Sequence, residues 1–322
     1  MSSHSAGNLS LSDINLHLLL ALSGQENLLI QLPEPHLLDS LCSRIAGFCS
    51  SSRFFKRSFH AVPQGLAHTA GEEADILGQF FITPQEDKER EGQVPQVLVI
   101  SSLDDYPSHL QIALKAILRN KRFEYDGQTF NLPEDFILVG VVNDWEKLPP
   151  FIIDVFGLSL QLDDIPSSPS FKNIPPLIPA QPPAHYVPML RVYAADVLSA
   201  LRHHPLLQNT LLTTRCGFQH LFKIATLWAR LKTYNGDASP VIETHGETAY
   251  ARDIEIRPQD IIDILLACIM HRLRTRSPDD RWDTLSWKQE GMNEETQKMD
   301  DAIRSGATLR YDLILQEVLE KV

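Results

Sequence analysis

The fold is decided by residues 96–160, which have the sequence QVLVISSLDDYPSHLQIALKAILRNKRFEYDGQTFNLPEDFILVGVVNDWEKLPPFIIDVFGLSL. The runs VLVI and FILVGVV are apolar without alternation, which is typical of parallel strands buried on both faces. Between them lie a segment with helical periodicity, SHLQIALKAILRN, and an Asp126-Gly127 pair, which is a strong hairpin signal. Strands that alternate with helices predict a wound α/β sheet.

The residues before this stretch continue the alternation. Ser12-Asp13 is typical of a helix start and is followed by INLHLLLALSG. We expect a strand in ENLLIQL, a helix in PHLLDSLCSRIAGFCSS and a strand in SRFFKRSFHAV. EADILGQFF is a short apolar segment in an otherwise polar region, and EDKEREG is expected to be a solvated insertion. These segments predict one α/β domain over residues 1–165.

The residues after this stretch change character twice. Prolines crowd residues 166–188, which predicts a stiff, extended linker because proline removes N–H donors and fixes φ. From residue 189 to 322 the pattern is helical, in MLRVYAADVLSALRHH, GFQHLFKIATLWARLK, PQDIIDILLACIMHRLRTR and LRYDLILQEVLEKV. Pro258 falls where the first turn of a helix tolerates it. We therefore expect a separate helical domain.

Composition restricts the class of protein. A net charge of −12 argues against nucleic-acid or anionic-membrane partners, because phosphate binding needs clustered Lys and Arg. No apolar run approaches the roughly 20 residues of a membrane span, and the start MSSHSAGNLSLSD lacks signal-peptide features. The four cysteines fit a reducing compartment, so we expect an intracellular protein, cytoplasmic or nuclear, without a metal site.

The place for a phosphate-binding loop is after the first strand, at residues 32–39. Such a loop has the pattern G-x-x-x-x-G-K-[ST], whereas this chain has LPEPHLLD. Leucines replace both glycines, Leu38 stands at the lysine position and Asp39 at the hydroxyl position. Two prolines also remove backbone donors, and Glu34 adds negative charge. We expect no ordinary binding of ATP and Mg²⁺ here.

The catalytic acids of a P-loop ATPase are also missing. The strand 97–100 ends in Ser101-Ser102, where an Asp-Glu pair would hold Mg²⁺ and polarise the attacking water. Asp104-Asp105 are either displaced metal ligands or the acidic start of a helix over 106–119, and we favour the helix start. A shift of three residues moves a carboxylate about 10 Å along an extended chain, which is too far for the usual ion position.

From about residue 11 to its end the chain resembles AAA+ ATPases of the magnesium chelatase and MoxR type, and more distantly MCM helicases. ALKAILRNKRFEYDGQTFNLPEDFILVGVVND is similar to the family's helix, inserted hairpin and sensor strand, which implies a nucleotide-sensing role for Asn143. LPPFIIDVFGLSL resembles the segment that carries the arginine finger, a position held here by Val155. TTRCGFQHLF resembles the helical lid, which implies that Arg215 is the second-sensor arginine. EADILG and His271-Arg272 match further elements of the framework.

This resemblance implies an AAA+ core followed by a helical lid domain. Because the framework is present and the catalytic groups are absent, we expect a catalytically degenerate protein without a cofactor. Its partners would be proteins, either an active AAA+ subunit or copies of itself, in an assembly where it is a scaffold or a regulator. Two alternatives stay open: a divergent but active magnesium chelatase-like ATPase that uses ATP and Mg²⁺, and a monomeric protein-interaction module.

Overall fold

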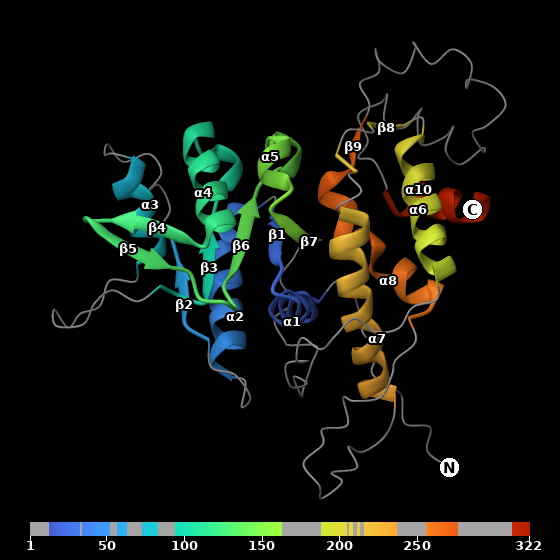
Figure 1. Cartoon of the computed structure of the whole chain (residues 1–322), viewed down its shortest axis with the longest axis horizontal. Coiled ribbons are helices and arrows are strands. Elements are labelled where there is room, and N and C mark those ends of the chain that lie inside the picture. Colours follow the sequence, from blue (N-terminus) through green and yellow to red (C-terminus); the bar gives the residue numbers. More distant parts are fainter. Residues whose placement is uncertain are drawn as a thin grey trace, which may run out of the picture. The chain divides into compact units, whose positions relative to one another are not determined.

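The structure, a computed structural model, divides into two compact units, Met1–Gln181 and Pro182–Val322. Their elements are labelled in Figure 1. The structure describes residues 13–32, 34–51, 57–62, 73–82, 94–162, 188–204, 206–208, 211–212, 216–236, 256–275 and 311–322. The predicted linker lies outside this part, except for its last residue, Pro188.

The first unit contains a five-stranded sheet in the order β2-β3-β6-β1-β7, and all neighbouring strands are parallel. Every residue of β3 and β6, the two runs predicted as buried strands, is buried. The register places Leu29 opposite Gly140, and Val99 opposite Val139. The strands are β1 (Asn27–Gln31), β2 (Phe59–Ala61), β3 (Val97–Ile100), β6 (Ile137–Val142) and β7 (Phe156–Gln161). The predicted wound α/β sheet is confirmed.

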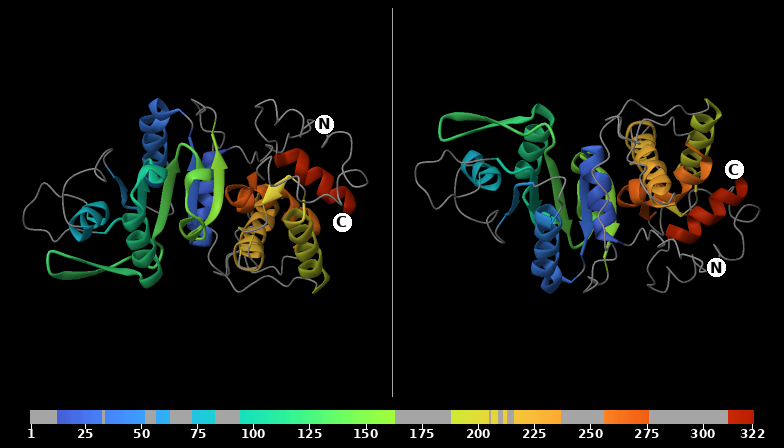
Figure 2. Two further views of the ribbon diagram at one scale, coloured as in Figure 1. Left: turned by 90° about the horizontal axis from the view of Figure 1, so that it is seen from above. Right: turned by 90° about the horizontal axis from the view of Figure 1, so that it is seen from below.

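Helices cover both faces of this sheet. Helix α2 lies on one face and α4 on the other, as Figure 2 shows. Helix α1 contacts α2 and packs against β1 and β7, while α3 and α5 contact α4. The bounds are α1 (Ile14–Gly24), α2 (Leu38–Ser51), α3 (Glu73–Phe81), α4 (Ser108–Asn120) and α5 (Pro150–Ile153).

Two helix starts illustrate the local chemistry. Helix α1 begins where predicted, because the Asp13 carboxylate accepts a hydrogen bond of 2.8 Å from the Asn15 N–H. The predicted helical segment SHLQIALKAILRN forms α4 (Ser108–Asn120), but the helix does not extend back to Tyr106 as the range 106–119 implied. A short 3-10 helix, η3 (Leu103–Asp105), takes up the preceding residues, and Pro107 is extended (φ −55°, ψ 143°).

A β-hairpin extends from the end of α4. Strands β4 (Arg122–Tyr125) and β5 (Gln128–Asn131) pair antiparallel around Asp126-Gly127, which confirms the predicted turn. Both turn residues have positive φ, 49° and 72°, as a type I′ turn requires. The Tyr125 ring lies over Gly78 of α3, where an added Cβ atom would overlap the ring. Glycine at this position therefore lets the helix and the hairpin approach closely.

The described residues of the second unit are mainly helical, as predicted. Their α-helices are α6 (Pro188–Arg202), α7 (Phe222–Gly236), α8 (Pro258–Ile269) and α10 (Tyr311–Lys321). Pro258 occupies the first turn of α8, which confirms its predicted place. A π-helical turn, η5 (Cys216–Leu221), precedes α7, and a short antiparallel pair joins β8 (Leu207–Gln208) to β9 (Arg274–Thr275). Among the described helices of both units, none is long and apolar enough to cross a bilayer.

Candidate functional site

Wound α/β folds form their ligand crevice at the carboxyl ends of the strands, where the strand order changes direction. In this chain β1 lies between β6 and β7, so this point falls at the end of β1. The segments 32–39, 101–106 and 143–148 follow β1, β3 and β6, and we call their meeting place the carboxyl edge. The predicted positions Leu38, Asp39, Ser101, Ser102 and Asn143 all belong to it.

The segment after β1 departs from a phosphate loop in its geometry as well as its sequence. The Leu32 N–H donates to the Val142 carbonyl over 2.8 Å, so the chain stays paired with β6 beyond the end of the strand. A 3-10 turn, η1 (Pro35–Leu37), leads directly into α2. Leu38 is the first residue of α2 and is buried, whereas Asp39 is exposed in the first turn. The first turn of this helix thus offers an incoming phosphate a carboxylate and no lysine.

The segment after β3 is a tight, well-bonded turn. Ser101 is buried, and Ser102 adopts a left-handed conformation with φ 51°. The Gln111 amide of α4 donates to the Leu103 carbonyl over 2.9 Å, which ties η3 to the helix that follows. Neither serine brings a carboxylate to the end of the strand.

Asp104 has a role that neither sequence interpretation included. Its two carboxylate oxygens accept from the backbone N–H groups of Asn143 and Asp144, over 3.3 and 3.1 Å. Burial raises the pKa of Asp104, while the bonds from Asp144 and Asn143 oppose the rise. The helix-start interpretation is therefore corrected: the residue lies in η3 and bridges two loops of the carboxyl edge.

Asn143 lies where the sequence predicted, directly after β6. Its carbonyl accepts from the Gln31 side-chain amide over 3.3 Å, which joins it to the end of β1. The next residue, Asp144, caps the 3-10 helix η4 (Trp145–Lys147) through the Glu146 N–H at 2.9 Å. The Asn143 side chain is half-buried, and its contact with a nucleotide remains a prediction.

Val155 does not join the other predicted positions. It precedes β7, so it lies at the opposite, amino edge of the sheet. There its carbonyl accepts from the Asn27 side chain over 2.9 Å, and the Asn27 oxygen accepts from the Leu138 N–H over 2.8 Å. Asn27 therefore connects three strands at their amino ends. Sequence reasoning missed this residue, because a lone Asn before an apolar run carries no distinctive signal.

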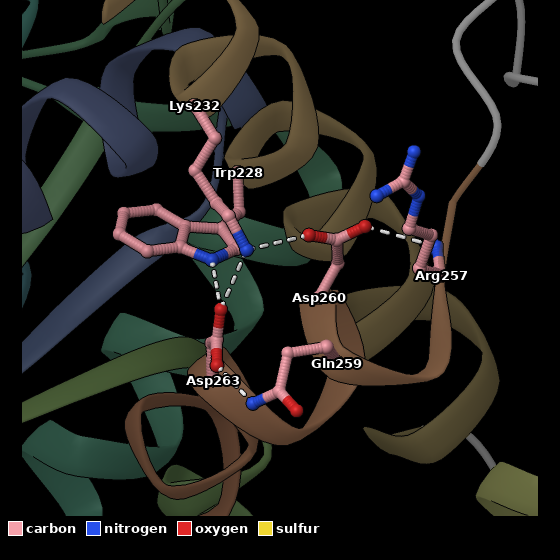
Figure 3. A network of polar contacts seen from close by, with 6 residues as sticks. All are labelled: Trp228, Lys232, Arg257, Gln259, Asp260 and Asp263. Carbon is pink, nitrogen blue, oxygen red and sulfur yellow. Dashed lines mark hydrogen bonds and ion pairs between the residues drawn. The ribbon is translucent and has the colours of Figure 1, made fainter. Parts of the chain in front are cut away.

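The second unit has polar contacts of its own. Arg215, the predicted second-sensor arginine, lies outside the described residues, directly before η5. His271 and Arg272 are buried at the end of α8, in η7 (Met270–Arg272). Figure 3 shows a network between α7 and α8 in which the Lys232 ammonium donates to Asp260 and Asp263, each over 2.8 Å.

This network extends to both sides of Lys232. The Trp228 indole N–H donates to Asp263 over 3.0 Å, Gln259 donates to the same carboxylate over 2.7 Å, and the Arg257 N–H donates to Asp260 over 2.9 Å. Burial lowers the pKa of Lys232, but its bonds to Asp260 and Asp263 outweigh that effect and raise it overall. The network joins two helices, and in the described residues no group of three or more His, Cys, Asp or Glu side chains could hold a metal ion.

Two solved structures resemble this chain. The crystal structure of a "putative ATPase" from Cytophaga hutchinsonii matches 96% of this chain and 88% of its own, with 15% identity and a TM-score of 0.59. A full-length MCM homolog from Methanopyrus kandleri matches 80% of this chain and 55% of its own, with 14% identity and a TM-score of 0.43. No protein-family model and no curated protein matches the sequence. The likeness to the first of these structures shows that the chain shares its α/β fold, a wound parallel sheet with surrounding helices.

Proposed function

We propose that this chain is a non-hydrolysing protein on the AAA+ fold, which acts as a scaffold or regulatory partner in an AAA+ assembly. The observation that carries the proposal is the segment after β1. It runs from Leu32 into α2 with leucines in place of both loop glycines, and the lysine position is a buried leucine. A triphosphate needs backbone N–H groups and a lysine at this point.

The state of the other catalytic positions supports the same conclusion. Phosphoryl transfer depends on positive groups placed around the developing charge, and an arginine finger alone contributes about 10³–10⁵ in rate. Ser101 and Ser102 supply no metal-binding carboxylate, Asp104 is bonded to backbone N–H groups, and Val155 stands at the finger position. Without the loop lysine, the metal-binding acids and the arginine finger, the chain lacks the groups that drive hydrolysis in P-loop ATPases.

The finer relationship, to magnesium chelatase and MoxR-type proteins, rests on the inserted hairpin and on the order of elements around it. Helix α4, the β4–β5 hairpin and strand β6 follow one another as that resemblance implies. Partners would be proteins, with an active AAA+ subunit as the first candidate and copies of this chain as the second. Asn143 and Arg215 are the residues proposed to face any nucleotide-like ligand.

Nucleotide binding is the direct test. Thermal unfolding of the purified chain would be followed with millimolar ATP and Mg²⁺, beside an ATPase assay. A ligand present at 100 times its Kd stabilises the folded state by about 2.7 kcal/mol, so an occupied site would raise Tm measurably. We expect no shift and no turnover above background. A saturable shift, with hydrolysis abolished by Asp104→Ala, would instead establish a divergent, active ATPase.

The scaffold role needs a second experiment. The full chain would be affinity-purified from its own cells, and co-purifying proteins with an intact P-loop would be identified by mass spectrometry. We expect an AAA+ protein among them, and a complex of defined mass by native mass spectrometry. A chain that stays monomeric at high concentration, alone and with such candidates, would contradict the assembly and favour a monomeric interaction module.

A further inference from the structure

One carboxylate joins two loops of the carboxyl edge. Asp104 comes from η3, and the two N–H groups that it accepts from lie 39 and 40 residues further along the chain, after β6. Each oxygen takes one donor, Oδ1 from Asn143 and Oδ2 from Asp144. Successive backbone N–H groups directed at one anion are an arrangement with which proteins bind phosphates and carboxylates. In this chain the anion is one of its own side chains.

The loop that presents Asp104 is fixed independently of this contact. Ser102 holds a left-handed conformation, which costs a residue with a Cβ atom about 1 kcal/mol and persists only where the surroundings impose it. The Asp105 N–H donates to the Ser102 carbonyl over 2.9 Å, and Gln111 holds the Leu103 carbonyl from α4. Leu103 itself is fully buried. The carboxylate is therefore delivered by a rigid turn.

The loop that receives Asp104 is also tied to its neighbour. The Gln31 amide donates to the Asn143 carbonyl, so the end of β1 is joined to the same short segment. Asp144 adds a cap on η4. The hydrogen bonds of Gln31 and Asp104 thus connect the segments at the ends of β1, β3 and β6. No bound ligand is needed to complete this connection.

We propose that Asp104 is an internal anion that occupies a two-donor backbone site at the end of β6 and clamps the loops after β3 and β6 together. Without it, the site would accept a small external carboxylate such as formate or acetate. The clamp follows from the geometry alone. Its consequence, loops of the carboxyl edge whose conformation does not respond to nucleotide, rests on the proposed function.

Hydrogen–deuterium exchange tests the clamp on the full chain without nucleotide. In Asp104→Ala we expect the Asn143 and Asp144 amides to exchange at least about tenfold faster, because both lose their acceptor. Asp104→Asn, which keeps the size of the side chain and one oxygen, should give an intermediate rate. The matched control is Asp105→Ala, which removes the exposed carboxylate next to Asp104. It should leave the exchange rates of the Asn143 and Asp144 amides unchanged.

Chemical rescue separates the anion site from a general loss of structure. Formate at tens of millimolar should restore slow exchange in Asp104→Ala, whereas chloride at the same ionic strength should not. Unchanged exchange in both Asp104 variants would overturn the clamp, and so would acceleration that formate fails to reverse. Either result would leave the proposed function intact. A thermal shift with ATP and Mg²⁺ in the unaltered chain would refute the proposed function and leave the exchange result standing.

Discussion

The two edges of the central sheet are held by different chemistry. At the carboxyl edge a carboxylate, Asp104, joins two backbone N–H groups. At the amino edge a neutral amide, Asn27, donates to one carbonyl and accepts from one N–H. A carboxylate can only accept, whereas an amide does both. The carboxyl edge therefore presents Asp104 with two donors, whereas the amino edge presents Asn27 with one donor and one acceptor.

The Asp104 contact explains how the loops of the carboxyl edge can stay ordered without a bound phosphate. Paired N–H groups left unsatisfied in a half-buried position would cost free energy, about 1–3 kcal/mol for each buried group. A protein that binds phosphate satisfies such donors with its ligand. In this chain Asp104 accepts from the two N–H groups after β6, so the carboxyl edge is stable without a bound ligand. On the proposed function, the geometry of the fold is separable from the chemistry of hydrolysis.

The helix that covers β1 and β7 contains a histidine that makes stability depend on pH. His17 lies in α1 and is fully buried, and burial lowers its pKa to about 4 from its ordinary value near 6.5. As the pH falls, the unfolded chain binds a proton at His17 before the folded chain does. The free energy of unfolding therefore keeps its full contribution from His17 above pH 6.5 and loses it as the pH drops toward 4. A shift of this size corresponds to about 3 kcal/mol.

Denaturant unfolding of the first unit at several pH values measures this loss. His17→Leu removes the titrating group, so its stability should vary less between pH 6.5 and 4 than that of the unaltered chain. His109→Leu changes an exposed histidine of α4 and should keep the original pH dependence. Parallel curves for the His17 variant and the unaltered chain would assign the acid response to other groups of the unit.

At the amino edge, Asn27→Ala removes both hydrogen bonds of one side chain. We expect the free energy of unfolding to fall by about 2–3 kcal/mol, because the Leu138 N–H and the Val155 carbonyl lose their partner. Asn27→Asp keeps the acceptor but places a carboxylate against a carbonyl, so it should also destabilise. Asn131→Ala, at an exposed position of the hairpin, should change stability by less than about 0.5 kcal/mol. Tolerance of Asn27→Ala would show that this edge needs no such connection.

The sequence predicted correctly the features that depend on residues close together in the chain. The apolar runs of β3 and β6 predict buried strands by themselves, and Asp126-Gly127 predicts its turn because both residues of a type I′ turn need positive φ. The position of Asn143 after its strand followed from the same pattern. Each of these inferences uses neighbours in the chain only.

The roles of Asp104 and Asn27 could not be predicted in the same way. Asp104 reaches N–H groups about 40 residues away, and Asn27 reaches partners 111 and 128 residues away. Periodicity indicates which face of a strand is buried, but not which distant backbone groups a polar side chain meets. An acid near the start of a helix is ordinarily a favourable charge at the helix dipole, so Asp104 carried no sign of a longer-range contact.

The variant Gln111→Ala tests whether the turn around Leu103 or the Asp104 carboxylate protects the amides of the carboxyl edge. The variant removes the bond from α4 to the Leu103 carbonyl and leaves Asp104 itself in place. We expect a loss of about 1–2 kcal/mol, since the side chain is buried and the carbonyl loses its donor. The Asn143 and Asp144 amides should exchange faster than in the unaltered chain but slower than in Asp104→Ala. Equal acceleration in the two variants would mean that the turn, rather than the carboxylate, protects these amides.

The smallest effect is expected in the second unit, which serves as a reference for both edges. Lys232→Met removes the ammonium between Asp260 and Asp263 but keeps the aliphatic stem of the side chain. Because the Lys232 side chain is 37% exposed, solvent screens the pair and the loss should be about 1 kcal/mol or less. Exchange should quicken in α7 and α8, while the Asn143 and Asp144 amides stay as they were. Faster exchange at those two amides would show that the carboxyl edge depends on the helical unit, and its independence as a clamp would be lost.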